Sequence, residues 1–224
     1  MISPAQIMGL SDEHIVALDK SHGLQQDTLE HFIIMQKAAA DDGHDLHICS
    51  SFRSFERQLS IWNRKWTGEL ALNTLDGKNL NAEQLSDEQK IHAIMLWSAL
   101  PGASRHHWGT DFDFYDKRKV ENCDTEFQLV TQEYEADGPC ADLSNWIQKH
   151  ADSFGFYLPY ANYVGGVAVE PWHLSFRSLA QKIESKFSPT LLYKQLEQAD
   201  ICGKYAVLKR LPELIERYTF NHGI

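Results

Sequence analysis

Two short segments, distant from each other in the chain, constrain the fold more than any other feature of this sequence. The first is Ser-Arg-His-His-Trp-Gly-Thr-Asp-Phe-Asp at 104–113, and the second is Glu-Pro-Trp-His at 170–173. Together they hold histidines, carboxylates and a spare glutamate, the side chains that a hydrolytic zinc site requires. Because a catalytic zinc takes three protein ligands and leaves one open position, a fold that uses this chemistry must bring the two segments together.

The spacing within the first segment excludes a helical metal motif. His106 and Asp113 are seven positions apart (113 − 106), whereas the helical HExxH motif places its histidines at i and i+4. Gly109 lies between them, where a tight backbone turn costs least. We therefore expect His106 on a turn before Gly109, Asp113 on the strand that follows, and His173 on a separate strand. The adjacent His107 is an alternative ligand or a supporting hydrogen-bond donor.

Two charged residues complete the predicted chemistry. Glu170 precedes His173 by three positions, and the intervening Pro171 favours an edge or a loop from which side chains aim into a cleft. Glu170 is then the natural general base, which takes a proton from the attacking water and passes it to the leaving amine. Arg53 suits a substrate carboxylate or a developing oxyanion. Taken singly, Glu170 also fits a strand-edge charge and Arg53 a surface ion pair.

Periodicity and turn residues predict a mixture of helices and strands. We expect helices over 24–40, 55–66, 87–100 and 143–154 and beyond 178, with capping signals at Ser86 and at Ser188-Pro189. We expect strands over 46–50 and 111–115, and an irregular excursion over 67–85. Residues 157–162 and 164–169 suggest either a pair of strands or a strand and a loop, and residues 174–176 continue as extended chain. Helices at both ends with strands between them indicate an α+β fold.

Composition narrows the class of protein. The 224 residues are enough for one hydrophobic core, which predicts a single domain over 1–224. The formal net charge of −10 disfavours binding to nucleic acid and gives no attraction to anionic membranes or wall polymers. No apolar stretch approaches the roughly 20 residues of a membrane span. The start of the chain shows no secretory signal, and the four scattered cysteines lack CxxC spacing, so we expect a cytoplasmic protein with reduced thiols.

Three motifs in this order resemble those of a known peptidase family. Ser104-x-His106-x-x-Gly109-x-Asp111-x-Asp113 resembles the SxHxxGxAxD motif of the D-alanyl-D-alanine carboxypeptidase and dipeptidase family. That family includes the VanY and VanX types and belongs to the LAS group of zinc peptidases. Residues 170–173 resemble its ExWH motif, and Ser50-Ser-Phe-Arg-Ser54 with Gln58 resembles its SGYRSxxxQ segment. The resemblance covers about residues 24–177, and a helical extension over about 180–224 lies outside it.

The resemblance implies a fold, a metal and roles for particular residues. The implied fold has a small central antiparallel sheet flanked by helices, as in hedgehog-type and D,D-peptidase relatives. The implied cofactor is one Zn²⁺ per chain, with His106, Asp113 and His173 as ligands and Glu170 as base. The residues expected at the substrate are Arg53, Gln58, Ser104, Asp111 and Trp172, although Trp172 also suits a wall or core position.

Two features depart from the family pattern. Asp111 stands where the family usually has Ala, and on a regular strand it points to the same face as Asp113. A second carboxylate there would bind a substrate amine, compete as a ligand or raise the pKa of a neighbour. We favour instead a structural role facing a helix N-terminus or solvent. Residues 67–100 also exceed the family core, and we expect them to wall one side of the cleft and restrict it to short peptides.

The leading functional prediction is a zinc carboxypeptidase that releases D-Ala from peptidoglycan-derived stem peptides, with D,D and L,D specificity not separated. A peptidoglycan endopeptidase and a D,D-dipeptidase are alternative enzymes. A metal-bearing binding module without peptidase activity is an alternative from another class, but pure binding does not require a base such as Glu170. The expected partner is a short peptide or muropeptide, and the sequence does not predict an oligomeric state.

Overall fold

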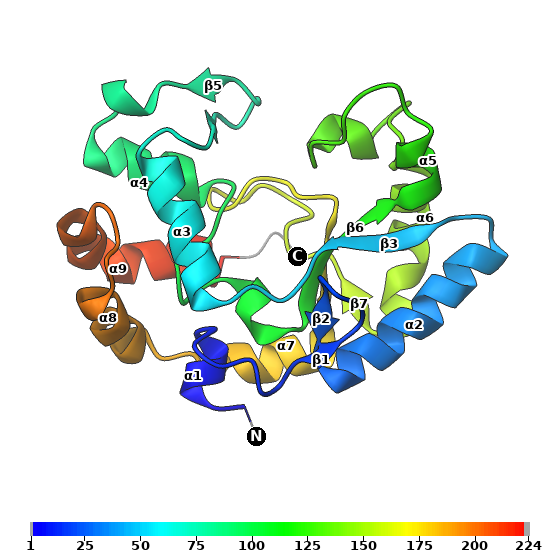
Figure 1. Cartoon of the computed structure of the whole chain (residues 1–224), viewed down its shortest axis with the longest axis horizontal. Coiled ribbons are helices and arrows are strands. Elements are labelled where there is room, and N and C mark those ends of the chain that lie inside the picture. The colour runs from blue at the N-terminus through cyan, green and yellow to red at the C-terminus, as the bar shows by residue number, and fades with distance from the viewer. Residues whose placement is uncertain (1, 222–224) are drawn as a thin grey trace.

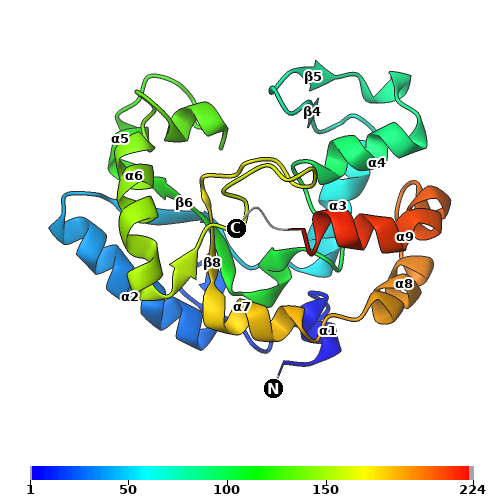
Figure 2. The ribbon, with the colours of Figure 1, turned by 180° about the vertical axis from the view of Figure 1, so that it is seen from behind.

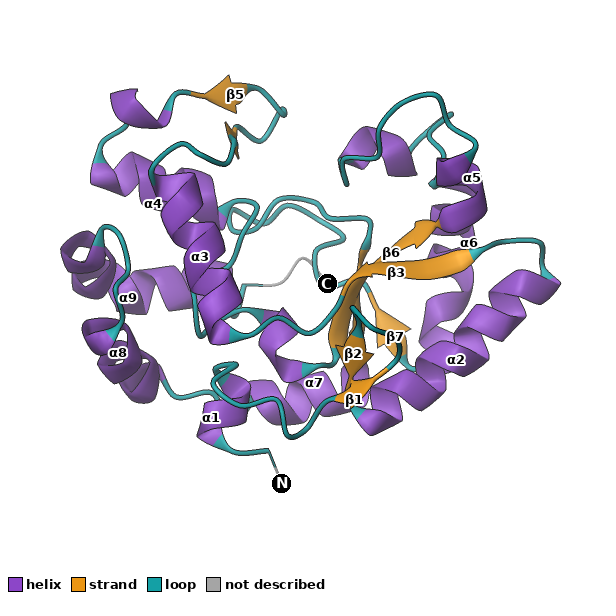
Figure 3. Cartoon of the chain, in the orientation of Figure 1, coloured by secondary structure: helices purple, strands orange, loops and turns teal. Residues whose placement is uncertain are grey.

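The computed structural model describes residues 2–221, in which helices surround a small central sheet (Figures 1 and 3). The α-helices are α1 Pro4–Ile7, α2 Gln26–Asp41, α3 Phe55–Trp66, α4 Asp87–Met95, α5 Lys117–Glu121, α6 Ala141–His150, α7 Arg177–Glu184, α8 Pro189–Gln198 and α9 Lys204–Tyr218. The strands are β1 Val16–Ala17, β2 Gly23–Leu24, β3 Leu46–Ser50, β4 Leu72–Asn73, β5 Asn79–Leu80, β6 Asp111–Asp116, β7 Phe156–Tyr157 and β8 His173–Phe176. Short 3₁₀ helices are η1 Ala82–Gln84, η2 Arg105–Trp108, η3 Thr131–Tyr134 and η4 Ala151–Phe154.

The central sheet has four antiparallel strands in the order β3-β6-β8-β7. Its apolar residues, among them Phe112 and Phe114 of β6, pack into one buried cluster with residues of α2 and α6. Both helices lie beside the sheet (Figure 2). Two-stranded ribbons, β1-β2 and β4-β5, lie outside this sheet. The predicted α+β fold, with a small antiparallel sheet flanked by helices, is confirmed.

Local sequence signals account for the helices that border the site. Ser54 caps α3 by accepting a hydrogen bond from the backbone N–H of Arg57, and Phe55, Leu59 and Trp62 are buried at helical spacing along one face. Ser86 forms the predicted capping box at the start of α4. The strand over 46–50 and the helix over 55–66 have the predicted bounds.

The C-terminal helices complete a second buried cluster. Leucines of α8 and α9 pack with Trp62 of α3 and with the apolar face of α4. The indole N–H of Trp62 also donates to the carbonyl of Cys202 at 3.0 Å. The segment after 180, whose role the sequence left open, therefore supports α3 and α4. These two helices lie beside the central sheet and its buried cluster (Figure 1).

The extended segment over 164–169 is not a strand, which corrects one of the two alternatives for this region. Its backbone is fastened to helices instead of to the sheet. The N–H of Ala168 donates to the carbonyl of Leu96 at 2.9 Å, and Arg217 of α9 donates to the carbonyl of Gly165 at 2.6 Å. The residues over 157–162 contribute only the two-residue strand β7.

Two further properties of the described part of the chain bear on the expectations from composition. Across residues 2–221, none of the helices combines the length and apolar character needed to cross a bilayer. Each of the four cysteines has a free thiol.

Candidate active site

The register of the sheet places the predicted ligands next to each other. Asp113 on β6 lies directly opposite His173, the first residue of β8. His106 comes from η2, which ends at Gly109 in the left-handed conformation with a φ of 69°. Because glycine adopts this conformation without strain, the chain can turn sharply and begin β6 at Asp111. The turn, strand and second strand are the three supports that the spacing predicted.

Atoms of these three residues converge on one point. A ligand atom of each of His106, Asp113 and His173 lies within 4.8 Å of the others. The Nδ1 of His106 donates to the carbonyl of Ser51 at 2.9 Å, so its Nε2 faces Asp113 at 3.4 Å. Asp113 Oδ1 is buried and lies 3.3 Å from His173 Nδ1 without satisfactory hydrogen-bond geometry. Two imidazole nitrogens around a carboxylate oxygen that lacks a hydrogen bond fit a tetrahedral metal such as zinc.

The electrostatics of the cluster favour a cation. The imidazole of His173 faces Asp111 at 3.0 Å, Asp113 at 3.3 Å and Glu170 at 3.4 Å. Burial opposes protonation, but these three carboxylates raise the pKa of His173 well above its usual value. In contrast, burial lowers the pKa of His106 to about 4, which keeps this imidazole in the neutral form that binds metals.

Of the two adjacent histidines, His106 and not His107 has a ring nitrogen directed at the cluster. Its Nδ1 donates to the carbonyl of Arg53 at 2.5 Å, and its Nε2 accepts from the backbone N–H of Gly102 at 3.0 Å. Both ring nitrogens are therefore occupied by backbone groups. Through the first of these bonds, His107 fixes the backbone of Arg53 beside the site.

Glu170 lies within the cluster, at the end of a loop that leads into β8. Its Oε2 is 3.4 Å from Nδ1 of His173, and its backbone N–H donates to the carbonyl of Tyr160 at 3.1 Å. Burial raises the pKa of Glu170, while His173 and the more distant Arg53 oppose that shift. A carboxylate with a raised pKa beside a metal position has the proton affinity that a general base needs.

Arg53 lies just beyond the C-terminal end of β3, and its guanidinium is oriented by two polar side chains. It donates to Oε1 of Gln58 at 2.8 Å and to Oγ of Ser50 at 3.0 Å. Burial lowers the pKa of Arg53, and Asp113 and Glu170 offset that effect. An arginine whose pKa is lowered remains cationic at neutral pH, so the cavity contains a fixed positive charge beside the carboxylates.

Asp111 corrects two expectations. It is fully buried, so it does not face solvent, and it does not line the cavity where substrate would bind. It accepts from Nε2 of His173 at 3.0 Å, from Nε of Arg105 at 2.7 Å and from Oγ1 of Thr110 at 2.6 Å. As predicted from strand geometry, it points to the same face as Asp113, and both approach His173 from that face.

The remaining residues expected at the substrate divide into two groups. Ser104 and Trp172 line the cavity, and Trp172 stacks on Trp97 with ring centroids 6.4 Å apart. Gln58 is fully buried and lies behind Arg53, where its amide also donates to the carbonyl of Ala99 at 2.7 Å. Gln58 therefore supports Arg53 instead of contacting a ligand, which corrects its predicted role.

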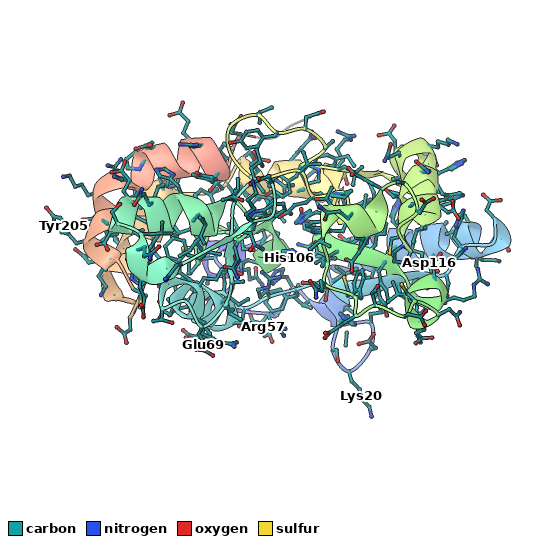
Figure 4. All side chains as sticks on the ribbon, turned by 90° about the horizontal axis from the view of Figure 1, so that it is seen from above. Lys20, Arg57, Glu69, His106, Asp116 and Tyr205 are labelled. Atoms are coloured by element: carbon teal, nitrogen blue, oxygen red, sulfur yellow. The ribbon has the colours of Figure 1, made fainter. Side chains whose placement is uncertain are left out.

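The cluster opens into a cavity of about 750 Å³ between two projecting arms. One arm is the β4-β5 ribbon, which contributes residues 73 and 75–77, and the other contributes residues 128–132 and 135 around η3 (Figure 1). His106 lies between the two halves of the molecule when these are seen from above (Figure 4). The excursion within 67–100 thus walls one side of the cleft, as expected.

Sequence reasoning missed three residues beside the site. Lys65 of α3 lines the cavity, and Tyr160 packs its ring edge-on against His173 with centroids 5.0 Å apart. Arg105 was passed over although it lies within the first motif. Only Lys65 could have been found from the sequence. It is seven residues after Gln58 (65 − 58) and therefore lies on the same face of α3 as that motif residue.

Comparison of the whole sequence with models of known protein families identifies the family of this chain. The sequence profile described as "VanY: D-alanyl-D-alanine carboxypeptidase" matches residues 21–179, most of the chain. The chain belongs to this family. It is a metallopeptidase with D-Ala carboxypeptidase-like activity, related to the enzymes that act on peptidoglycan.

Individual relatives are consistent with this placement. An uncharacterized protein of Haemophilus influenzae is 43% identical over 103 residues, which cover 44% of this chain and 70% of that protein. The D,D-pentapeptidase VanY of a VanB-type resistance cassette, solved as a variant with Zn(II), superposes with a TM-score of 0.53 at 20% identity, covering 77% of this chain and 86% of that chain. VanYB in complex with D-alanine-D-alanine gives a TM-score of 0.55 at 19% identity, covering 85% and 91%. At these identities the two structures establish a shared fold.

Proposed function

We propose that this protein is a zinc-dependent carboxypeptidase that releases a C-terminal D-Ala from short peptidoglycan stem peptides. The observation that supports it best is the juxtaposition of a three-ligand cluster with Glu170 and Arg53 in one cavity. His106, Asp113 and His173 would hold the zinc. The metal would supply a Lewis acid for the scissile carbonyl and lower the pKa of the attacking water. The D-Ala-containing ligand of VanYB supports the choice of substrate.

The protein's own residues would divide the remaining work. Glu170 takes the proton from the attacking water and delivers it to the nitrogen of the leaving amino acid. Arg53 binds the terminal carboxylate in a geometry that Gln58 and Ser50 fix in advance. The aromatic wall of Trp172 and Tyr160 limits access of bulk water to the cluster.

A second cation favours a free terminal carboxylate over an internal peptide bond. Lys65 lines the same cavity as Arg53, and burial lowers its pKa, while Glu170 opposes that shift. Within residues 2–221, its ammonium makes no hydrogen bond or ion pair. A partly buried cation without a partner favours an anionic ligand, which a substrate's terminal carboxylate supplies and the middle of a chain does not.

Zinc content and product analysis test the proposal together. We expect protein prepared without chelator to contain one zinc per chain and to release D-Ala from tetra- or pentapeptide stems, detected by mass spectrometry. Internal cleavage fragments would identify an endopeptidase, and free D-Ala-D-Ala as the preferred substrate would identify a dipeptidase. Bound zinc without turnover of any stem peptide would support a binding module, and a protein without zinc would contradict the proposal.

Replacing Lys65 with methionine tests the second cation. The substitution keeps most of the apolar stem and removes the charge, so we expect KM for stem peptides to rise about tenfold with kcat little changed, because charged hydrogen bonds contribute about 1.5–3 kcal/mol. Lys149→Met, on the exposed face of α6, is the matched control and should leave KM unchanged. An unaltered KM in the Lys65 variant would remove this residue from substrate binding.

A further inference from the structure

Three carboxylates surround His173, and only two of them have a place in the proposed chemistry. Asp113 is a proposed ligand and Glu170 the proposed base, and both contact Nδ1 of the imidazole, whereas Asp111 contacts the other ring nitrogen, Nε2. Ala usually occupies the position of Asp111 in the motif that the sequence resembles. The charge at this position therefore needs an explanation specific to this chain.

The hydrogen bond from His173 to Asp111 determines which ring nitrogen faces the cluster. A carboxylate only accepts hydrogen bonds, so the 3.0 Å contact places a proton on Nε2. Nδ1 then points toward Asp113 and Glu170, at 3.3 and 3.4 Å. A ligating histidine is commonly held in this way, because the partner of the second nitrogen sets the tautomer and the orientation of the ring.

Arg105 neutralises the buried charge of Asp111. It is 2% exposed and forms an ion pair with Asp111 at 2.7 Å. Its Nη2 donates to the hydroxyls of Tyr157 at 2.8 Å and Ser175 at 2.9 Å, and its Nη1 lies 3.5 Å from a carboxylate oxygen of Glu184. Its guanidinium lies over the ring of Trp108 at 4.7 Å. These contacts lock the guanidinium in place, and the Asp111 charge is compensated instead of being added to those of the other two carboxylates.

We propose that Asp111 and Arg105 form a coupled pair of positioning residues that holds His173 with Nδ1 directed at the metal. The proposal rests on the metal site of the proposed function. It adds a requirement that the three ligands alone do not contain: the affinity for metal depends on a charged pair outside the ligand set. Substitution of Asp111 alone would leave Arg105 with only the longer 3.5 Å contact to Glu184 as its ion pair, and substitution of Arg105 alone would remove the closest cation from the buried Asp111.

Metal binding by Asp111→Asn tests the pair directly. Asparagine has the shape of aspartate but lacks its charge and can present its amide N–H₂ to the ring, so the preference for one tautomer weakens. We expect the Kd for Zn²⁺, measured by competition with a chromogenic chelator, to rise by about 10- to 100-fold, as for other partners of ligating histidines. We also expect the visible spectrum of the Co²⁺-loaded protein to shift, which a loss of stability alone would not cause.

The matched control is a second buried aspartate on the same strand. Asp116 is 1% exposed, caps α5 and lies at the far end of β6 from the cluster. Asp116→Asn should lower the melting temperature yet leave the Zn²⁺ Kd and the Co²⁺ spectrum as they are in the unaltered protein. Comparison of the two variants separates positioning of His173 from a general cost of losing a buried carboxylate.

A double variant keeps the test decisive if Asp111→Asn does not fold. Asp111→Ala with Arg105→Met removes both charges of the pair, so Arg105 does not remain buried with only the 3.5 Å contact to Glu184, and the double variant should melt at a higher temperature than Asp111→Ala by itself. Its Zn²⁺ Kd should still rise at least tenfold. A folded variant of either kind with unchanged Kd and spectrum would overturn the proposal. Failure of the unaltered protein to bind Zn²⁺ or Co²⁺ would instead overturn the proposed function on which it rests.

Discussion

Replacement of Glu170 by glutamine is expected to lower kcat on D-Ala-terminated stem peptides by about 10²–10⁴-fold, the usual contribution of a general acid–base group. The amide cannot take the proton from water or return it to the leaving nitrogen. Its shape is nearly that of the carboxylate, and the three proposed ligands are unchanged, so zinc should remain bound. The measurements are steady-state kinetics and zinc content on the same preparation.

The control for this substitution is Glu121→Gln on α5, an exposed carboxylate that is outside the cavity. It should match the unaltered protein in kcat and zinc content. Full activity in the Glu170 variant with zinc retained would show that another group moves the proton. Loss of zinc together with activity would show that Glu170 holds the metal instead.

The supports of the site were predictable because they depend on local signals. The turn at Gly109 and the alternation of carboxylates and aromatics after it indicate a turn followed by a strand, and both are present. The strand before Arg53 and the helix after it were both predicted with the bounds that the structure has, Leu46–Ser50 and Phe55–Trp66. The three proposed ligands converge because each lies on one of these predicted elements or at its end.

Partners that lie far apart in the sequence were less predictable. The burial of Asp111 depends on Arg105, which comes from η2, and on Tyr157 and Ser175, which anchor that arginine from two other strands. Spacing shows which face of β6 carries Asp111 but not which cation meets it there. For the same reason the sequence indicated Gln58 as a substrate contact, although its amide is used by the backbone of Ala99.

The C-terminal helices and the loop over 164–169 illustrate the same limit. Helical periodicity after 180 was readable, but the surface that the helices cover is created only when α3 and α4 fold against them. The loop contains the β-branched residues Val167 and Val169, which favour extended chain. It stays outside the sheet because Arg217 of α9 and the carbonyl of Leu96 at the end of α4 take up its backbone groups.

The second large effect is expected for Arg53→Met, and it depends on the substrate. The unaltered protein should prefer a stem peptide with a free C-terminal carboxylate over the same peptide with a C-terminal amide, because the guanidinium that Gln58 and Ser50 hold in place matches a carboxylate. Truncating one partner of a buried charge pair costs about 2–5 kcal/mol, so kcat/KM for the acid should fall by about 10²–10³-fold.

The amide peptide is the internal control for the same variant. It lacks the charge that Arg53 would bind, so its kcat/KM should change much less, and the preference for acid over amide should nearly disappear. An equal loss on both peptides would mean that Arg53 acts on the reacting carbonyl, as an oxyanion-stabilising cation does. The charge of Arg53 interacts with the carboxylates of Asp113 and Glu170, so zinc content must be measured on the same preparations. A variant that loses zinc would assign to Arg53 a role in balancing the negative charge of the metal cluster.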